Sequence, residues 1–117
     1  MKTIASLPVL CCGPGVATLA PAESDALAAR FKALADPTRV GIINRLAGAV
    51  EVCVCDLTAA FDLSQPTISH HLRVLRDVGL VTAAKRGTWS YYRLVPDAVE
   101  PLRIALGARP PDGSAQS

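Results

Sequence analysis

The amino-acid sequence predicts a mainly α-helical α+β domain, in which four helices are followed by a β-hairpin and a last helix. Apolar residues recur at helical spacing between residues 24 and 78, whereas β-branched and aromatic residues dominate residues 81–94. Turn-forming residues separate these segments. The chain has 117 residues and half are hydrophobic, which suits one domain with a packed core. A chain this short buries a modest core, so we expect a dimer that shares it.

Capping residues delimit the first two helices. We expect the first helix to begin near Ser24 and to carry an apolar face that includes Leu27. The side chain of Asp36 can cap a second helix, and Pro37 is tolerated in the first turn of that helix. Gly48 follows its last apolar residues and ends it.

A short third helix and a longer fourth helix come next. The third covers residues 56–61, and the turn at residues 63–66 leads into the fourth, which runs to about Val78. Gly79 stands where a helix commonly ends in the left-handed conformation. Ile68, Leu72 and Leu75 lie on one face of the fourth helix and should form its buried stripe.

The segments after this helix have the two-residue period of strands. Residues 81–86 and 88–94 form a predicted hairpin that turns at Arg86-Gly87, and a last helix covers residues 96–106. A short helix, a turn, a longer helix and a hairpin constitute a winged helix-turn-helix. The predicted organisation is an N-terminal arm at residues 1–22, the winged domain at 23–107 and a disordered tail at 108–117.

The polar face of the fourth helix and the hairpin are candidates for contacts with double-stranded DNA. Five basic residues and one acidic residue lie between positions 64 and 95, although the whole chain carries a net charge of only +2. An ordinary solvated helix face is the alternative, and the basic hairpin favours the DNA interface. The candidate contacts are Gln65, Thr67, Ser69, His70, Arg73, Lys85 and Arg86. We expect packing roles for His71, Trp89, Tyr91 and Tyr92.

The cysteines form two close pairs, Cys11-Cys12 and Cys53-Val54-Cys55. Such spacing makes poor structural disulfides, so we expect reduced thiols in the cytoplasm; a signal peptide in the arm is the weaker alternative. No apolar run approaches the ~20 residues needed to cross a membrane. Thiols at i and i+2 diverge on a regular helix, so Cys53 and Cys55 can hold one ion only at a helix end.

Three motifs resemble the ArsR/SmtB family of bacterial metal-sensing repressors. They are Ala33-Leu34-Ala35-Asp36-Pro37-Thr38-Arg39, Glu51-Val52-Cys53-Val54-Cys55-Asp56-Leu57 and residues 63–72, LSQPTISHHL. The resemblance covers residues 24–106. It implies a homodimeric winged-helix repressor that binds operator DNA, and whose affinity for the operator falls when a metal binds. It also implies that the first and last helices form the dimer interface.

The same resemblance suggests which residues hold the inducing ion. One site type uses carboxylate and imidazole ligands on the last helix, but here that helix offers only Asp97 and Glu100 and no histidine. The other type is thiolate-based, and Thr58 stands where arsenic-responsive members often carry a third cysteine. The predicted ligands are therefore Cys11, Cys12, Cys53 and Cys55.

The predicted inducer is As(III) or Sb(III), because residues 64–71 are most similar to the arsenic-responsive branch. Cd(II) or Pb(II) is the alternative, since four thiolates suit those ions too. A thiol-redox switch of DNA binding is a further alternative. We expect no enzymatic activity, because no sequence signature places a nucleophile beside a base.

Overall fold

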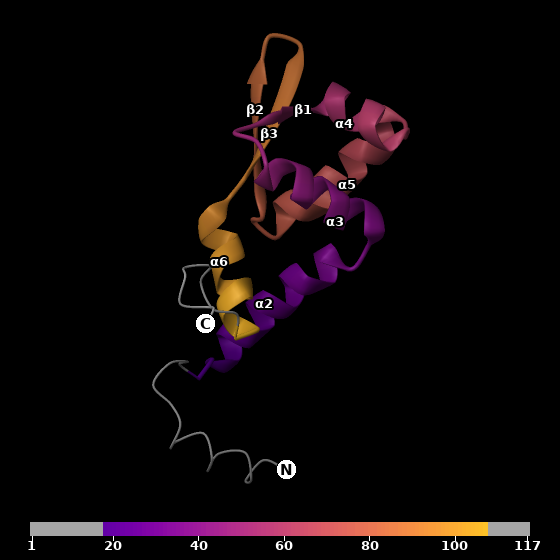
Figure 1. Ribbon diagram of the computed structural model, residues 1–117. Helices are drawn as coiled ribbons and strands as arrows, with labels where there is room; N and C mark the ends of the chain where they lie inside the picture. The colour runs from indigo at the N-terminus through magenta and orange to yellow at the C-terminus, as the bar shows by residue number, and fades with distance from the viewer. Residues whose placement is uncertain (1–17, 108–117) are drawn as a thin grey trace, which may run out of the picture.

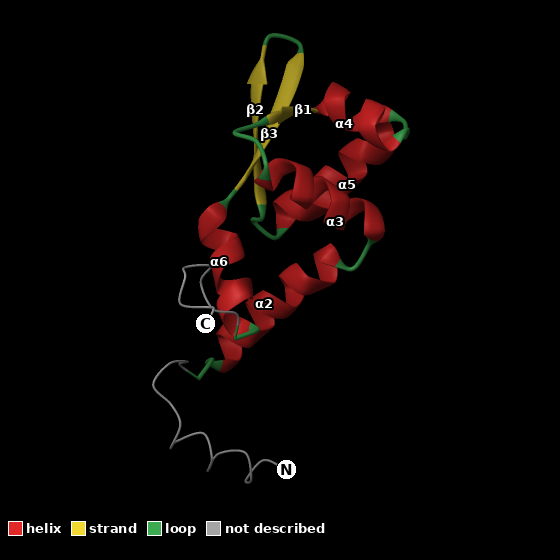
Figure 2. Ribbon diagram, in the orientation of Figure 1, coloured by secondary structure: helices red, strands yellow, loops and turns green. Residues whose placement is uncertain are grey.

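Helices make up most of the fold, and a small sheet projects from one end of them (Figures 1 and 2). The computed structural model describes residues 18–107. In chain order the elements are α2 (Pro21–Leu34), α3 (Pro37–Ala47), β1 (Val52–Cys53), α4 (Val54–Phe61), α5 (Gln65–Asp77), β2 (Val81–Arg86), β3 (Trp89–Leu94) and α6 (Pro96–Ala105). This order confirms the predicted winged helix-turn-helix. None of these helices is long and apolar enough to cross a membrane.

Two helices begin earlier than predicted, and each has a local cause. Helix α2 begins at Pro21 because the carboxylate of Glu23 accepts the backbone N–H of Ala20 at 2.8 Å. Helix α4 begins at Val54 rather than at residue 56, because the Cys53 sulfur caps it by accepting the backbone N–H of Cys55. Both thiols of the Cys53-Val54-Cys55 motif therefore lie at a helix N-terminus, as predicted.

The sheet has one strand more than the predicted hairpin. Strand β1 pairs antiparallel with β3, with Val52 opposite Tyr92 and Cys53 opposite Tyr91, so the strand order is β1-β3-β2. Strands β2 and β3 form the wing, and their last pair joins Arg86 to Trp89. A two-residue strand has no periodicity of its own, so its partner alone defines it.

The core lies where α5 meets α3, α4 and the base of the wing. Ile68, Leu72 and Leu75 are fully buried, which confirms the predicted stripe of α5. They pack in one cluster with buried residues that include Ile42, Leu46, Leu57, Leu80 and Val81. Burying each such side chain stabilises the fold by roughly 1.5–3 kcal/mol, so this cluster fixes α5 against the rest of the domain.

The connections on either side of α5 are short and specific. Asp62 ends α4 in the left-handed conformation, with φ of 56°, and its N–H donates to the carbonyl of Thr58. The hydroxyl of Ser64 then caps α5 by accepting the backbone N–H of Thr67. After α5, Gly79 has φ of 80°, as its predicted role as terminator requires.

Helices α2 and α6 pack against each other, and Arg30 joins them to the end of α5. Its Nε donates to the carbonyl of Val78 at 2.9 Å, and its Nη1 donates to that of Ala98 at 3.4 Å. Phe31 of α2 and Ile104 of α6 nevertheless remain exposed, at 37% and 47%. These two helices thus leave apolar side chains that the described residues do not cover.

Replacing Gly79 by alanine should destabilise the fold by about 1–2 kcal/mol, because a side chain disfavours the left-handed conformation. Gly48→Ala is the matched control. Gly48 has φ of −94°, and an added Cβ would meet only backbone oxygens at 3.8–4.0 Å. Urea unfolding measures both variants; equal losses of stability would contradict a conformational requirement specific to Gly79.

Candidate thiol site and nucleic-acid interface

Helix α5 presents most of the predicted DNA contacts on its outer face. Gln65, Thr67, His70 and Arg73 are exposed, and Ser69 is half-buried. Gln65 and Thr67 lie in the first turn, which is the part of such a helix that enters the major groove. The buried stripe on the opposite side holds this polar face outward.

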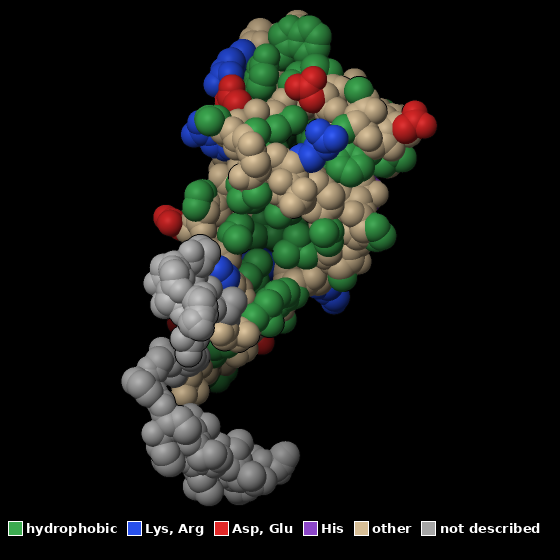
Figure 3. Space-filling model, in the orientation of Figure 1, with side chains coloured by type: hydrophobic (Ala, Val, Ile, Leu, Met, Phe, Trp, Pro, Cys, Tyr) green, Lys and Arg blue, Asp and Glu red, His purple; other side chains and the backbone are tan. Residues whose placement is uncertain are grey.

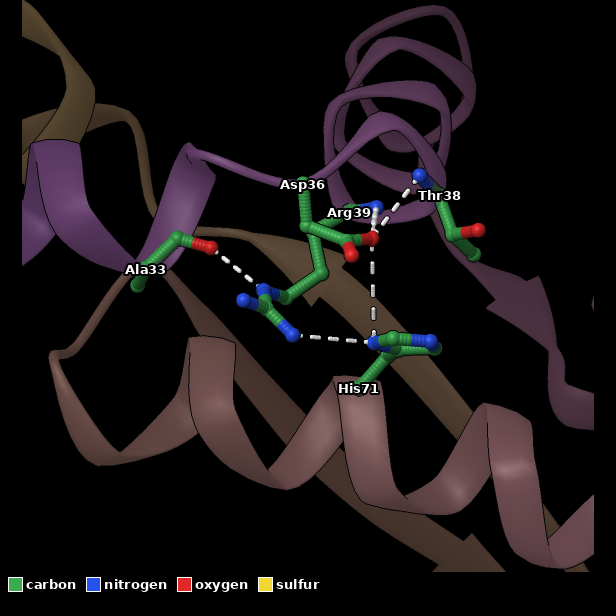
Figure 4. Close-up of polar contacts among 5 residues, drawn as sticks. All are labelled: Ala33, Asp36, Thr38, Arg39 and His71. Carbon is green, nitrogen blue, oxygen red and sulfur yellow. Dashed lines mark hydrogen bonds and ion pairs between the residues drawn. The ribbon is translucent and has the colours of Figure 1, made fainter.

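A polar cluster beneath α5 fixes its position relative to α2 and α3 (Figure 4). The Arg39 guanidinium donates from Nε to the carbonyl of Ala33 at 2.5 Å and from Nη1 to His71 Nδ1 at 3.0 Å. Because arginine only donates, His71 Nδ1 must accept, and its hydrogen lies on Nε2. The His71 side chain is only 14% exposed, which confirms its predicted packing role.

Asp36 completes this cluster. Its Oδ2 accepts the backbone N–H groups of Thr38 at 2.9 Å and of Arg39 at 3.2 Å, which confirms the predicted cap of α3. Its Oδ2 also lies 4.0 Å from His71 Nδ1. The bonds from the Arg39 and Thr38 N–H groups, that from Arg39 most of all, hold the pKa of the Asp36 carboxyl below its ordinary value of 3.8.

The wing carries the remaining predicted DNA contacts. Lys85 and Arg86 are both exposed, but Arg86 forms a two-point ion pair with Glu51, in which Nη2 donates to Oε1 at 2.9 Å. The hydrogen bond with Arg86 lowers the pKa of Glu51, and the same bond raises the pKa of Arg86. The Glu51 carboxylate therefore occupies two of the five N–H donors of Arg86 and offsets its charge. No local pattern links positions 51 and 86, so this pair could not be predicted from the sequence.

Two packing predictions for the wing have different outcomes. Tyr92 packs against the core, as predicted, and Tyr91 is half-buried under the guanidinium of Arg86. Trp89 is 54% exposed, so the packing prediction is wrong for this residue. Trp89 stands opposite Arg86 in the last residue pair before the turn of the hairpin. Figure 3 shows hydrophobic side chains at this end of the molecule.

The thiols of Cys53 and Cys55 differ in exposure but lie together. Cys53 is buried and Cys55 is exposed, and the Cys55 N–H donates to the Cys53 sulfur at 3.3 Å. The interaction with the Cys53 thiol is the main cause of a raised pKa of Cys55, with further contributions from burial and from the charge of Asp56. Cys55 is therefore a protonated thiol at neutral pH.

One cavity of about 180 Å³ joins this thiol pair to the predicted DNA-contacting elements. It is lined by Cys53, Val54, Cys55 and Thr58 from β1 and α4, by Gln65 from α5, and by Thr88, Trp89 and Ser90 from the wing. An ion bound to both sulfurs would thus lie beside the first turn of α5. Among residues 18–107, however, no group of three or more histidine, cysteine or acidic side chains could hold a metal ion.

The other two predicted metal ligands belong to the N-terminal arm. Cys11 and Cys12 lie outside the described residues. On α6, Glu100 is paired with Arg103 rather than with a ligand set, and this hydrogen bond lowers the pKa of Glu100.

Comparison with known proteins identifies one family. Residues 36–83 match the model of the bacterial regulatory protein, arsR family. The chain is 54% identical to the arsenical resistance operon repressor of Escherichia coli over 66 residues, 56% of each chain. It is 45% identical to that of Bacillus subtilis over 73 residues, 62% of this chain and 70% of the relative. A cadmium resistance regulatory protein homologue (CadC) from Staphylococcus aureus is 43% identical over 62% of this chain and 60% of its own.

Solved structures agree with this result. A possible transcriptional regulator for arsenical resistance has a TM-score of 0.62 at 40% identity, covering 67% of this chain and 80% of its own. A homodimeric winged helix-turn-helix DNA-binding domain from Mycobacterium bovis has a TM-score of 0.63 at 30% identity, covering 79% and 88%. The chain spans just over half the length of the E. coli relative.

The Asp36 cap should make stability depend on pH. Because folding lowers this carboxyl's pKa, the stabilisation is present above the ordinary pKa of 3.8 and is lost as the pH falls through the lowered value. Wild type should therefore be more stable than Asp36→Asn at pH 7, and the difference should shrink below about pH 4. Chemical unfolding across this range measures it. Asp36→Ser, which caps without titrating, should show no such pH dependence, and a pH-independent gap between wild type and Asp36→Asn would contradict the assignment.

Proposed function

Because the chain belongs to the arsR family of bacterial regulatory proteins, we propose that it is an arsenite- or antimonite-responsive repressor. It binds operator DNA as a homodimer and releases it when As(III) or Sb(III) binds cysteine thiolates. One observation carries the proposal: Cys53 and Cys55 share a cavity with Gln65, a residue in the first turn of α5. Ligand binding and DNA reading then use adjacent residues.

Operator binding follows from the exposed face of α5 and from the wing. Gln65 offers donor and acceptor groups to a base edge, and Thr67, Ser69, His70 and Arg73 extend the polar face. Lys85 and Arg86 on the wing suit phosphates. Two α5 helices reading successive major grooves must lie ~34 Å apart, which requires a second subunit.

The exposed apolar residues of α2 and α6 support dimerisation. Phe31 of α2, Ile104 of α6 and Leu106 directly after α6 are exposed at 37%, 47% and 72%, and these two helices already pack against each other. A second copy could bury this surface. A homodimeric structural relative at 30% identity is consistent with this arrangement.

The ligand chemistry requires a thiol from outside residues 18–107. As(III) forms three bonds to sulfur, and the described residues contribute only Cys53 and Cys55. The chain's other cysteines are Cys11 and Cys12, so one of them supplies the third bond. Arsenous acid condenses with three thiols: three As–O bonds break, three As–S bonds form, and three waters leave. No oxidant is needed, and thiols that stay reduced in the cytoplasm suit the reaction.

The energy required for release is modest. A hundredfold loss of affinity for the operator corresponds to a coupling free energy of about 2.7 kcal/mol between ligand binding and DNA binding. This value lies in the usual range for allosteric proteins. Helix α4 begins at the thiols and packs against α5, so a ligand that moves this end of α4 also biases the position of α5.

A double substitution tests the thiol set. Cys11→Ser with Cys12→Ser should leave operator binding intact but abolish release by arsenite, because only two sulfurs remain. Adding Thr58→Cys to this variant should restore release, since Thr58 lines the same cavity one helical turn after Cys55. Operator binding with and without arsenite, measured by fluorescence anisotropy of labelled DNA, gives both results. Unchanged release without Cys11 and Cys12 would remove them from the site.

Cadmium or lead is the second candidate inducer, favoured by the similarity to the S. aureus cadmium-resistance regulatory protein homologue. Ultraviolet thiolate absorption followed by a free-thiol count distinguishes the ions: about three thiols consumed with arsenite support As(III), and four with cadmium support Cd(II). Release on mild oxidation without metal would instead indicate the redox switch.

Two wing substitutions test the proposed DNA contacts. Lys85→Ala should weaken DNA binding about equally for all sequences and reduce the slope of log affinity against log salt by about one. Arg86→Ala should change the slope less, because Glu51 already neutralises the Arg86 charge. Affinities measured between 50 and 300 mM salt give the two slopes. Equal slopes for Lys85→Ala and wild type would mean that Lys85 binds no phosphate.

A further inference from the structure

The wing forms one wall of the cavity that contains the thiols. Thr88 of the hairpin turn and Trp89 and Ser90 at the start of β3 line it together with Cys53 and Cys55, and Gln65 contributes from the first turn of α5. The cavity therefore lies between the two elements proposed to contact DNA. It has about 180 Å³ of free volume, which leaves room for a ligand among these side chains.

Trp89 is the largest side chain of this wall and is left half-uncovered. It is 54% exposed, whereas the next aromatic residues of β3, Tyr91 and Tyr92, are half-buried. An exposed tryptophan leaves a large apolar area in water. A cavity with two soft sulfur ligands beside a polarisable ring suits a soft metalloid rather than a hydrated hard ion.

The wing is also bonded to the chain segment that carries the thiols. Cys53 pairs with Tyr91 in the sheet, two residues after Trp89. Two residues before Cys53, Glu51 holds Arg86, the strand partner of Trp89. The Cys53–Tyr91 strand pair and the Glu51–Arg86 ion pair therefore both connect residues 51–53 to the wing near Trp89. A displacement at Cys53 therefore acts on the wing as well.

We propose that the wing is part of the inducer site, with Trp89 as a positioning residue that closes over the ligand. The inference rests on the proposed function and concerns the same site. A ligand at Cys53 and Cys55, together with a third thiolate, enters between Trp89 and Gln65 and changes the separation of wing and α5. Release then results from displacement of both DNA-contacting elements, and not from movement of α5 alone.

The fluorescence of Trp89 tests the inference directly, because it is the chain's only tryptophan. Fully reduced full-length protein is titrated with sodium arsenite while thiolate absorption and tryptophan emission are recorded together. The emission should change and saturate at the same arsenite concentration as the absorption. In Cys53→Ser/Cys55→Ser, arsenite should leave the emission unchanged. The Cys11→Ser/Cys12→Ser/Thr58→Cys variant should retain the emission change, because its ligand stays in the cavity.

Substitution of Trp89 supplies a second measurement. Trp89→Ala should raise the arsenite concentration needed for half-release of operator DNA by at least about fivefold, the lower end of ordinary coupling effects. Trp89→Phe, which keeps an aromatic wall, should respond much more like wild type. Each variant is compared with its own metal-free DNA affinity, so a direct contribution of Trp89 to DNA binding does not enter the ratio.

The outcomes separate this inference from the proposed function. A thiolate band without a change in Trp89 emission, or equal arsenite responses of Trp89→Ala and wild type, overturns the role of the wing and leaves the sensor intact. Emission that changes with DNA but not with arsenite makes Trp89 a DNA contact and likewise overturns it. If wild type shows no thiolate band with arsenite or with cadmium, the proposed function fails and this inference fails with it.

Discussion

The burial of one apolar stripe on α5 determines where the proposed DNA contacts of this helix lie. Ile68, Leu72 and Leu75 are completely buried, so the opposite face of α5 must point to solvent. The Arg39 guanidinium then fixes the helix along its length by joining His71 to the end of α2. Hydrophobic burial supplies most of the stabilisation, whereas the polar cluster sets orientation. Together they hold Gln65 and Arg73 outward before any DNA arrives.

Cys53 has three structural roles at once, and this makes the thiol site sensitive to what binds there. Its backbone extends the sheet, its sulfur caps α4, and its side chain lines the cavity beside Gln65. A ligand on this sulfur therefore acts on a strand, a helix terminus and the base of the wing together. The exposed Cys55 gives access to the same cavity from solvent, so the buried thiol can be reached without unfolding.

The features that the sequence predicts are those with local causes. The cap at Asp36, the terminator at Gly79 and the stripe of α5 follow from short-range chemistry and periodicity, and the structure confirms them. Three other features depend on partners far along the chain, so no local sequence pattern predicts them. They are strand β1, the Glu51–Arg86 pair and the exposure of Trp89. For the thiol site, position at a helix end is predictable for Cys53 and Cys55, whereas their shared cavity with the wing requires the fold. The roles of Cys11 and Cys12 stay predictions.

The left-handed turn at Asp62 has a mechanical consequence. It belongs to a connection of only three residues, 62–64, between two helices that pack against each other, so a tilt of one helix acts on the other. Helix α4 is about 12 Å long. A shift of about 1 Å at its thiol end tilts it by about 5°, and the short connection and shared packing transmit this tilt to α5, which is about 20 Å long. Helix α4 then acts as a short lever. Its length determines how far a ligand bound to the sulfur atoms at its N-terminus displaces the exposed side chains of α5 that are proposed to contact bases.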